Sequence, residues 1–150
     1  MLGGWAISSE CAEKIGEVYP FGTILELGSG EGTKFLSRFY DVYSIEHDEN
    51  YVGKYDSTYI YAPIVDGWYD VSRLQDLPNY GLLLIDGPPA TIKADIRLKF
   101  LDHVDLFNLD AIIVLDDVQR AAEMKLADVL SEITGRKMNV YGTSKKFAVI

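Results

Sequence analysis

Acidic side chains stand at the ends of three apolar, strand-like segments of this chain. They are Glu46, Asp86 and the neighbouring pair Asp116 and Asp117. A carboxylate beside a reacting hydroxyl can accept its proton as a general base. Three carboxylates held close together repel one another unless protons or a cation lie among them, and a hard divalent ion such as Mg²⁺ prefers oxygen ligands of this kind. We therefore take Asp86 and Asp116 as candidate catalytic residues, and Asp86, Asp116 and Asp117 as candidate metal ligands.

A glycine-rich turn is the second feature that points to chemistry. Gly28, Gly30 and Gly32 occupy alternate positions between an apolar segment, residues 23–27, and a segment of helical character. Glycine leaves no Cβ in the way of a ligand, and the start of a helix offers free N–H groups at the positive end of the helix dipole. The pattern differs from the dinucleotide-binding one, which requires glycine at the position of Thr33. The turn therefore indicates that the backbone approaches a ligand.

Glu46 adds a second contact for such a ligand. It ends the strand-like segment that follows Gly28, where a carboxylate can accept hydrogen bonds from both hydroxyls of a ribose. The alternative is that the glycines only make a tight connection between two elements. The turn and the carboxylate together favour a ligand that contains a nucleoside.

Strand-like and helical segments alternate along the chain and position these residues. Strands are predicted over residues 23–27, 42–46, 58–65, 82–85, 111–115, 137–141 and 146–150, with a turn at 66–70. Helices are predicted between the capping residue Ser8 and Pro20, and over residues 34–39, 50–55, 92–104 and 122–133. In the second of these, Phe35, Leu36 and Phe39 are expected to be buried. The alternation predicts an α/β fold with a mostly parallel sheet and a closing hairpin, and it places the ligand beyond the carboxyl ends of the strands.

Composition limits the class of protein. The chain has 150 residues, enough for one domain with a full core, and its 48% hydrophobic and 25% charged residues are typical of a soluble globular protein. The net charge of −9, with no basic cluster larger than the pair Lys145 and Lys146, argues against nucleic acid as a partner. Cys11 is the only cysteine, and the sequence shows no apolar run long enough for a membrane span and no signal peptide. We therefore expect a cytoplasmic protein.

Two segments resemble the cofactor motifs of class I S-adenosylmethionine-dependent methyltransferases. They are residues 24–33, Ile-Leu-Glu-Leu-Gly-Ser-Gly-Glu-Gly-Thr, and residues 43–48, Tyr-Ser-Ile-Glu-His-Asp. The resemblance covers nearly the whole chain, and the closing hairpin matches the antiparallel seventh strand of that family. It implies a single domain over residues 1–150, built as a Rossmann-like three-layer sandwich with a seven-stranded sheet of order 3-2-1-4-5-7-6. It also implies S-adenosylmethionine as the cofactor.

The resemblance further assigns cofactor-binding roles to residues at the strand ends. The methionine part of the cofactor would lie against the glycine turn, the ribose would be held by Glu46, and the adenine would lie near Asp66 and Gly67. Trp68 either stacks on the adenine or closes the edge of the core, and Trp5 either covers the cofactor or packs on the sheet. The implied set is Glu26, Gly28, Ser29, Gly30, Gly32, Glu46, His47, Asp66, Gly67, Trp68 and Asp86.

The acidic strand ends are similar to those of the catechol and caffeoyl-CoA group of O-methyltransferases. In that group an Asp after the fourth strand and an Asp-Asn pair after the fifth bind a metal, which lowers the pKa of the acceptor hydroxyl. This chain has Asp117 where the group has Asn, and Asp86 leads into Gly87-Pro88-Pro89. The alternative is that both residues start loops, with Asp117 capping the next helix. In that helix Arg120 either pairs with Glu123 or binds an acidic acceptor.

These features predict methyl transfer from S-adenosylmethionine to a hydroxyl of a small molecule or glycan, with Asp86 as the base. The chain leaves few residues for acceptor recognition. A cofactor-binding protein without methyl transfer, either regulatory or cofactor-cleaving, is therefore the main alternative. An interaction module with an inactive site is a third, and the intact set of Gly28, Gly30 and Glu46 argues against it. An open cleft is compatible with a homodimer in which a partner subunit covers it.

Overall fold

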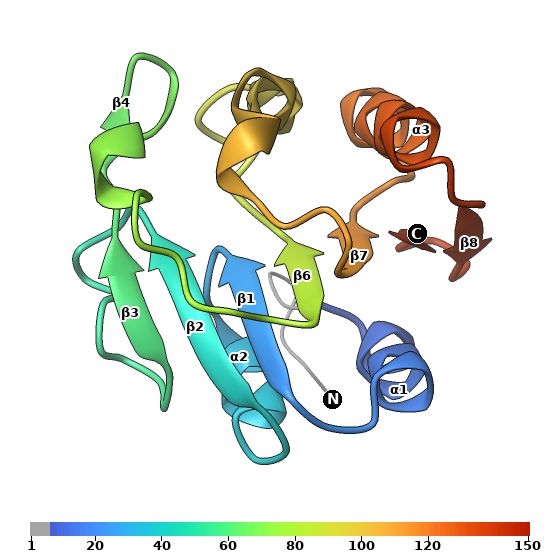
Figure 1. Ribbon diagram of the computed structural model, residues 1–150, viewed down its shortest axis with the longest axis horizontal. Coiled ribbons are helices and arrows are strands. Elements are labelled where there is room, and N and C mark those ends of the chain that lie inside the picture. Colours follow the sequence, from blue (N-terminus) through green and yellow to red (C-terminus); the bar gives the residue numbers. More distant parts are fainter. Residues whose placement is uncertain (1–6) are drawn as a thin grey trace.

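The computed structural model describes residues 7–150 and is built around a seven-stranded sheet (Figure 1). In spatial order its strands are β3 (Thr58–Tyr61), β2 (Asp41–Glu46), β1 (Thr23–Leu27), β6 (Leu82–Ile85), β7 (Ile112–Asp116), β9 (Phe147–Val149) and β8 (Asn139–Tyr141). The pairs from β3 to β7 are parallel, whereas β9 runs antiparallel to both of its neighbours. The predicted strand order and the closing hairpin are confirmed.

Helices cover both faces of the sheet and complete a three-layer sandwich (Figure 1). One face carries α1 (Ser9–Val18) and α2 (Glu31–Leu36). The other face carries η2 (Ile96–Leu106), a 3₁₀-helical segment divided by a kink at His103, and α3 (Ala121–Thr134). A short 3₁₀ helix, η1 (Val71–Arg73), precedes β6 in the chain. In the described part of the chain, no helix has both the length and the apolar character that a membrane span requires.

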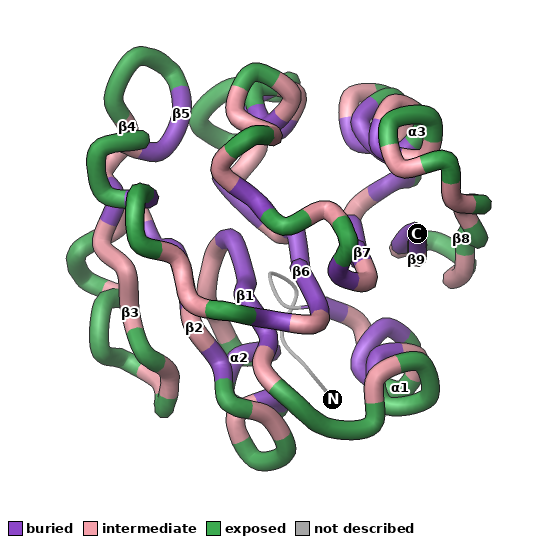
Figure 2. Tube along the Cα trace, viewed as in Figure 1, coloured by how far each residue is buried: buried purple, intermediate pink, exposed green. Residues whose placement is uncertain are grey.

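The alternation of side chains along the central strands explains why these strands are apolar throughout. Leu82 and Leu84 pack into the core under α1 and α2, whereas Leu83 and Ile85 pack into the core under η2 and α3. The buried positions gather in β1, β6 and β7 at the middle of the sheet (Figure 2). A sheet buried on both faces leaves its carboxyl edge as the place where polar groups can meet.

Local signals set the ends of the two longer α-helices. The Ser8 side chain accepts a hydrogen bond from the Cys11 N–H at 3.1 Å and caps the start of α1, as predicted. Gly135 ends α3 in the left-handed conformation, with a φ of 68°. The stripe predicted over residues 92–104 forms a helix only from Ile96 onward.

Two predictions on the α2 side of the sheet are wrong. Helix α2 ends at Leu36, so Leu36 is buried while Phe35 and Phe39 remain 36% and 61% exposed. Residues 50–55 form a series of turns and no helix, with hydrogen bonds from Tyr51 N to Asp48 O and from Lys54 N to Tyr51 O. Trp5 lies outside the described residues.

The strand predicted over residues 58–65 is divided in two. Pro63 has no N–H to donate to a ladder, and β3 therefore ends before it. After it, β4 (Ile64–Val65) pairs with β5 (Trp68–Tyr69) in a small separate hairpin. The predicted turn at residues 66–70 thus contains a short strand.

Candidate active site

The carboxyl ends of β1, β2, β6 and β7 surround one pocket of about 650 Å³. Its wall includes Gly28 after β1, Glu46 at the end of β2, Asp86 after β6 and Asp117 after β7. Lys145, from the turn between β8 and β9, also lines this pocket. A pocket of this size is typical of sites for small molecules and cofactors.

Gly28 is required by the protein's own packing. It has a φ of 88°, and a Cβ at this position would lie 2.9 Å from the Asp86 carbonyl oxygen. The turn after β1 can therefore approach the end of β6 only because this residue has no side chain. A Cβ on Gly30, by contrast, would meet nothing within 4 Å. The open space over Gly30 leaves room for a ligand against the turn.

The amide groups of the glycine turn donate to acceptors within the protein. Gly28 N–H donates to Ile45 O at 2.8 Å, Ser29 N–H donates to Glu46 Oε1 at 3.2 Å, and Gly30 N–H donates to Thr33 Oγ1 at 3.0 Å. The sequence predicted free N–H groups at the start of the helix, which begins at Glu31. The three donors named above precede it and fix the shape of the turn.

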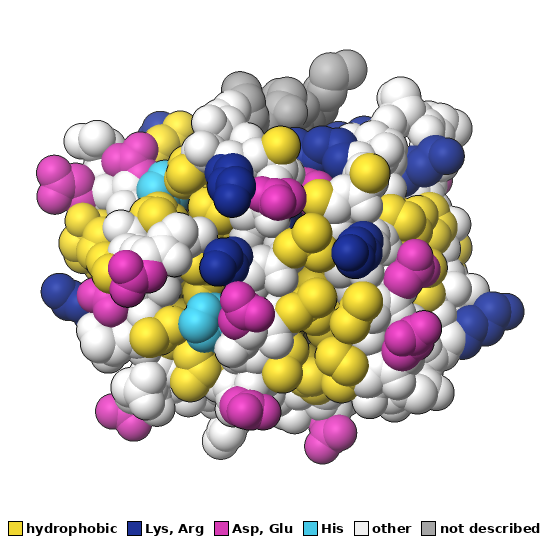
Figure 3. Space-filling model, turned by 90° about the horizontal axis from the view of Figure 1, so that it is seen from above, with side chains coloured by type: hydrophobic (Ala, Val, Ile, Leu, Met, Phe, Trp, Pro, Cys, Tyr) yellow, Lys and Arg dark blue, Asp and Glu magenta, His cyan; other side chains and the backbone are white. Residues whose placement is uncertain are grey.

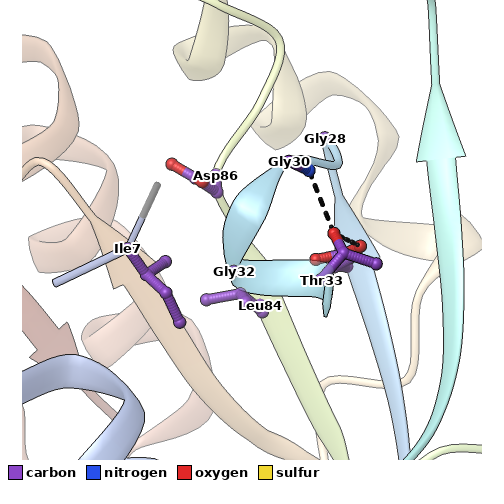
Figure 4. A pocket seen from close by; sticks show the side chains of 8 residues that line it. Ile7, Gly28, Gly30, Gly32, Thr33, Leu84 and Asp86 are labelled. Carbon is purple, nitrogen blue, oxygen red and sulfur yellow. Dashed lines mark hydrogen bonds between the residues drawn. The ribbon is translucent and has the colours of Figure 1, made fainter. Parts of the chain in front are cut away.

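Glu26 supports the turn from behind. It is 3% exposed, and its Oε2 accepts hydrogen bonds from Thr33 Oγ1 and Ser44 Oγ, both at 2.5 Å. Thr33 in turn holds the Gly30 amide, as Figure 4 shows. Burial raises the pKa of Glu26 to about 7, although the two hydroxyl hydrogen bonds act in the opposite direction. Glu26 and Gly32 line a cavity of about 10 Å³ behind the turn and are not part of the large pocket's wall.

Glu46 is almost fully engaged by its neighbours. Oε1 accepts from Ser29 N and from Ser29 Oγ at 2.6 Å, and Oε2 accepts from Asp48 N at 3.0 Å and lies 3.2 Å from His47 Nδ1. Burial acts to raise the pKa of Glu46, but the hydrogen bonds from His47, Ser29 and Asp48 outweigh it and hold the pKa below its usual value. A carboxylate has about four acceptor positions. A ribose diol would therefore bind Glu46 by replacing the Ser29 hydroxyl or the His47 ring.

The three candidate metal ligands come together as the sequence predicted. One oxygen atom from each of Asp86, Asp116 and Asp117 lies within 4.8 Å of the other two. Asp116 is fully buried, and neither of its side-chain oxygens has a hydrogen-bond partner among residues 7–150. Burial raises the pKa of Asp86 well above its usual range, and the nearby Asp116 carboxylate adds to the effect. Burial, followed by the neighbouring Asp117, likewise raises the pKa of Asp116.

Basic side chains of the protein already lie on this acidic cluster. Asp117 accepts from Arg97 Nη1 and Arg120 Nη2, each at 2.9 Å, and from Lys145 Nζ at 2.7 Å. Lys145 Nζ also lies 3.0 Å from Asp116 Oδ2. Burial acts to raise the pKa of Asp117, but the bonds from Lys145 and Arg97 lower it overall. A resident divalent metal does not fit this arrangement, because the Lys145 ammonium group already pairs with two of the three proposed ligands, Asp116 and Asp117.

Asp117 does not cap the following helix. Arg120 stands at the N-cap position of α3, and Asp117 has a φ of 63° with its side chain bound to cations. Arg120 pairs with Glu123 at 2.8 Å, which is the structural alternative offered by the sequence. It also lines the pocket with its 38% exposed side chain.

Arg97 is a site residue that the sequence analysis missed. The residue is 4% exposed, and its guanidinium donates from Nε to Pro88 O and from Nη2 to Asp86 O, both at 3.1 Å. It thereby ties the loop after β6 to Asp117 at the end of β7. Arg97 and Lys145 contact residues that are distant in the sequence, so no spacing pattern pointed to either of them.

Three residues predicted near the adenine do not line the pocket. Asp66 and Gly67 form the exposed turn of the β4–β5 hairpin. Trp68 is 1% exposed and stacks on His103, with ring centroids 4.8 Å apart. The structure thus supports the core alternative for Trp68. Residues of the turns after β2, among them Tyr51 and Tyr55, line the pocket instead.

Comparison with known proteins gives a consistent result for the fold. The sequence matches no protein-family model and has no significant match among curated proteins. A solved structure described as precorrin-8w decarboxylase from Methanobacterium thermoautotrophicum matches with a TM-score of 0.60 and 12% identity, over 99% of this chain and 91% of that one. The C-terminal domain of precorrin-6Y C5,15-methyltransferase from Rhodobacter capsulatus matches with a TM-score of 0.59 and 13% identity, over 99% of this chain and 90% of that one. A TehB-like S-adenosylmethionine-dependent methyltransferase from Corynebacterium glutamicum matches with a TM-score of 0.53 and 14% identity, over 93% of this chain and 84% of that one. Together with the strand order, these matches show that the chain has the fold of the class I S-adenosylmethionine-dependent methyltransferases.

Proposed function

We propose that this protein transfers the methyl group of S-adenosylmethionine to a hydroxyl of a small molecule or glycan. The observation that carries the proposal is that one pocket of about 650 Å³ joins the glycine turn and Glu46 to Asp86. The first two suit a nucleoside-containing cofactor, and the third is a carboxylate able to take a proton. The known folds with which the chain compares support methyl transfer as the reaction class.

The chain's own residues would hold the cofactor at the ends of β1 and β2. The space over Gly30 accommodates the methionine part, and the Glu46 carboxylate accepts hydrogen bonds from the ribose hydroxyls once Ser29 or His47 turns away. The aromatic rings of Tyr51 and Tyr55 offer flat apolar surfaces in the same part of the pocket. The cofactor supplies a methyl group that is already activated as a sulfonium.

Asp86 then acts on the acceptor. Its raised pKa makes the ionised carboxylate a stronger base than an exposed aspartate, so it can take the proton of the acceptor hydroxyl as that oxygen bonds to the methyl carbon. Asp116 supports this by its negative charge, which increases the proton affinity of Asp86. The pocket mainly has to align the oxygen with the methyl group. No step is assigned to a metal, because Lys145 lies where the sequence suggested Mg²⁺.

The charge of the protein bears on the class of acceptor. Figure 3 shows basic and acidic side chains interspersed over the face that carries η2 and α3. The net charge of −9 disfavours a nucleic-acid acceptor. We therefore retain small molecules and glycans as the acceptor class.

Calorimetric titration with S-adenosylmethionine tests the cofactor part of the proposal. We expect binding by the wild-type protein and a loss of affinity of about tenfold or more in Glu46→Gln, which keeps the shape but loses charged acceptors. Glu49→Gln, an exposed acid nearby, is the matched control. No binding, or equal binding by Glu46→Gln, would remove the cofactor assignment.

Mass spectrometry separates methyl transfer from its alternatives. The protein is incubated with cofactor and a panel of hydroxylated small molecules and oligosaccharides, and products are searched for a gain of one methylene. S-adenosylhomocysteine formed only when an acceptor is present supports methyl transfer. Cofactor fragments formed without any acceptor would indicate a cofactor-cleaving enzyme, and intact cofactor under all conditions would favour a regulatory protein.

A further inference from the structure

We propose that Lys145 is a built-in replacement for a divalent metal, and that its removal converts Asp86, Asp116 and Asp117 into a site for an oxygen-preferring divalent cation. The inference goes beyond the proposed function and does not depend on it. It rests on the placement of one lysine among carboxylates from two neighbouring strand ends.

The three carboxylates have the spacing of a cation site. One oxygen from each lies within 4.8 Å of the others. In a six-coordinate site with bonds of about 2.4 Å, opposite oxygens are about 4.8 Å apart and neighbouring ones about 3.4 Å, so a bound ion would draw these carboxylates closer together. Because Asp86 follows β6 and Asp116 ends the adjacent β7, the sheet itself fixes this spacing.

Lys145 is the counter-ion that now occupies the cluster. Its Nζ lies 2.7 Å from Asp117 Oδ1 and 3.0 Å from Asp116 Oδ2. Within the described residues, Lys145 is the only basic side chain paired with Asp116. Asp116 is fully buried and forms no ion pair with any other described residue, so this single ammonium group neutralises it.

The two arginines of the cluster cannot take over this role. Arg97 is held in place by the carbonyl oxygens of Asp86 and Pro88, and Arg120 divides its Nη2 between Asp117 and Glu123. The cluster already has one more acidic than basic side chain. Its members are Asp86, Asp116, Asp117, Glu123, Arg97, Arg120 and Lys145.

Without Lys145 the cluster has four acidic side chains and two basic ones. A divalent cation replaces the lost positive charge, and the ion would meet only oxygen ligands, which suits Ca²⁺, Mg²⁺ and Mn²⁺. Lys145 is also 29% exposed and comes from the turn between β8 and β9, so its replacement opens the cluster toward solvent.

Binding of Mn²⁺, followed by electron paramagnetic resonance of the free ion, tests the proposal without any activity measurement. The wild-type protein is expected to leave the free Mn²⁺ signal unchanged. Lys145→Met, which keeps the aliphatic stem and loses the charge, is expected to bind one Mn²⁺ per chain at least about tenfold more tightly, and Ca²⁺ should compete. Lys146→Met, the exposed neighbour, should behave as the wild type. Adding Asp116→Asn to Lys145→Met should abolish the gained site.

Either of two results would overturn the proposal: stoichiometric Mn²⁺ binding by the wild-type protein, or no gain in binding by the folded Lys145→Met variant. If circular dichroism shows that this variant is unfolded, Lys145→Gln takes its place. If both are unfolded, recovery of the folded signal on addition of Mn²⁺ supports the proposal and continued unfolding refutes it. The proposed methyl transfer would stand or fall separately, on the calorimetry and product analysis above.

Discussion

Arg97 Nη1 and Asp117 Oδ2 form an ion pair of 2.9 Å that joins η2 to the residue after β7, and the Arg97 side chain is almost fully buried. Replacing Arg97 by Met leaves Asp117 and two carbonyl oxygens without this donor. We expect the free energy of unfolding to fall by about 3–5 kcal/mol, as for other buried pairs that lose one partner. Urea unfolding measures the change. Arg73→Met breaks a 3.9 Å pair with Asp70 at a half-exposed position, and this control should cost less than about 1 kcal/mol. Similar losses in both variants would contradict the assigned role of Arg97.

Gly28 and Gly30 should respond to substitution in opposite ways. Gly28→Ala places a Cβ 2.9 Å from the Asp86 carbonyl at a φ of 88°, and we expect a destabilisation of about 1–3 kcal/mol. Gly30→Ser adds its Cβ in open space at the N-cap of α2, so stability should be kept while cofactor affinity falls. Thermal unfolding and calorimetric titration give the two readouts. A stable Gly28→Ala variant would show that the turn can relax away from β6.

Asp86→Asn tests the proposed base. The amide keeps the size of the carboxyl group but cannot accept the acceptor proton, so kcat should fall by about a hundredfold or more while cofactor affinity changes little. Asp110→Asn, an exposed position outside the pocket wall, is the control. Chelation by EDTA should leave the wild-type rate unchanged, since Lys145 supplies the positive charge. An unchanged kcat in Asp86→Asn would assign proton transfer to another group.

The stability of the protein should depend on pH through Glu26. Burial raises its pKa from 4.5 to about 7, so between these values the folded state binds a proton that the unfolded state has lost. The resulting stabilisation is fully present below about pH 4.5 and disappears as the pH rises through 7. Glu26→Gln removes this dependence, and its stability relative to wild type should increase by about 2 kcal/mol from pH 5.5 to 8. Urea unfolding at both pH values measures the difference. A difference between Glu26→Gln and wild type that stays constant with pH would refute the shift.

The central strands could be predicted because each is marked by residues that are neighbours in the sequence. Residues 82–85 and 23–27 are short apolar runs between turn residues, and they form strands at the predicted positions. Leu36 shows the limit of this reasoning, because nothing in its neighbourhood says that α2 ends there and leaves Phe39 in solvent. Pro63 was a local signal for the divided third strand.

The candidate site was predictable where one strand end determines one residue, as for Gly28, Glu46 and Asp86. It was not predictable where several distant segments meet. Arg97 and Lys145 reach Asp117 from 20 and 28 residues away, and such contacts leave no spacing pattern in a single sequence. For Trp68 the sequence left two alternatives open, because an aromatic residue after a turn can either close the edge of the core or stack on a ligand.

The direction of the hydrogen bonds at the glycine turn has a consequence for ligand choice. Gly28, Ser29 and Gly30 point their amide protons at Ile45, Glu46 and Thr33, which lie within the protein. A pyrophosphate group is recognised by amide protons that point outward from such a turn. These three amide groups are therefore unavailable for that mode of anion recognition, which disfavours a pyrophosphate against this part of the turn.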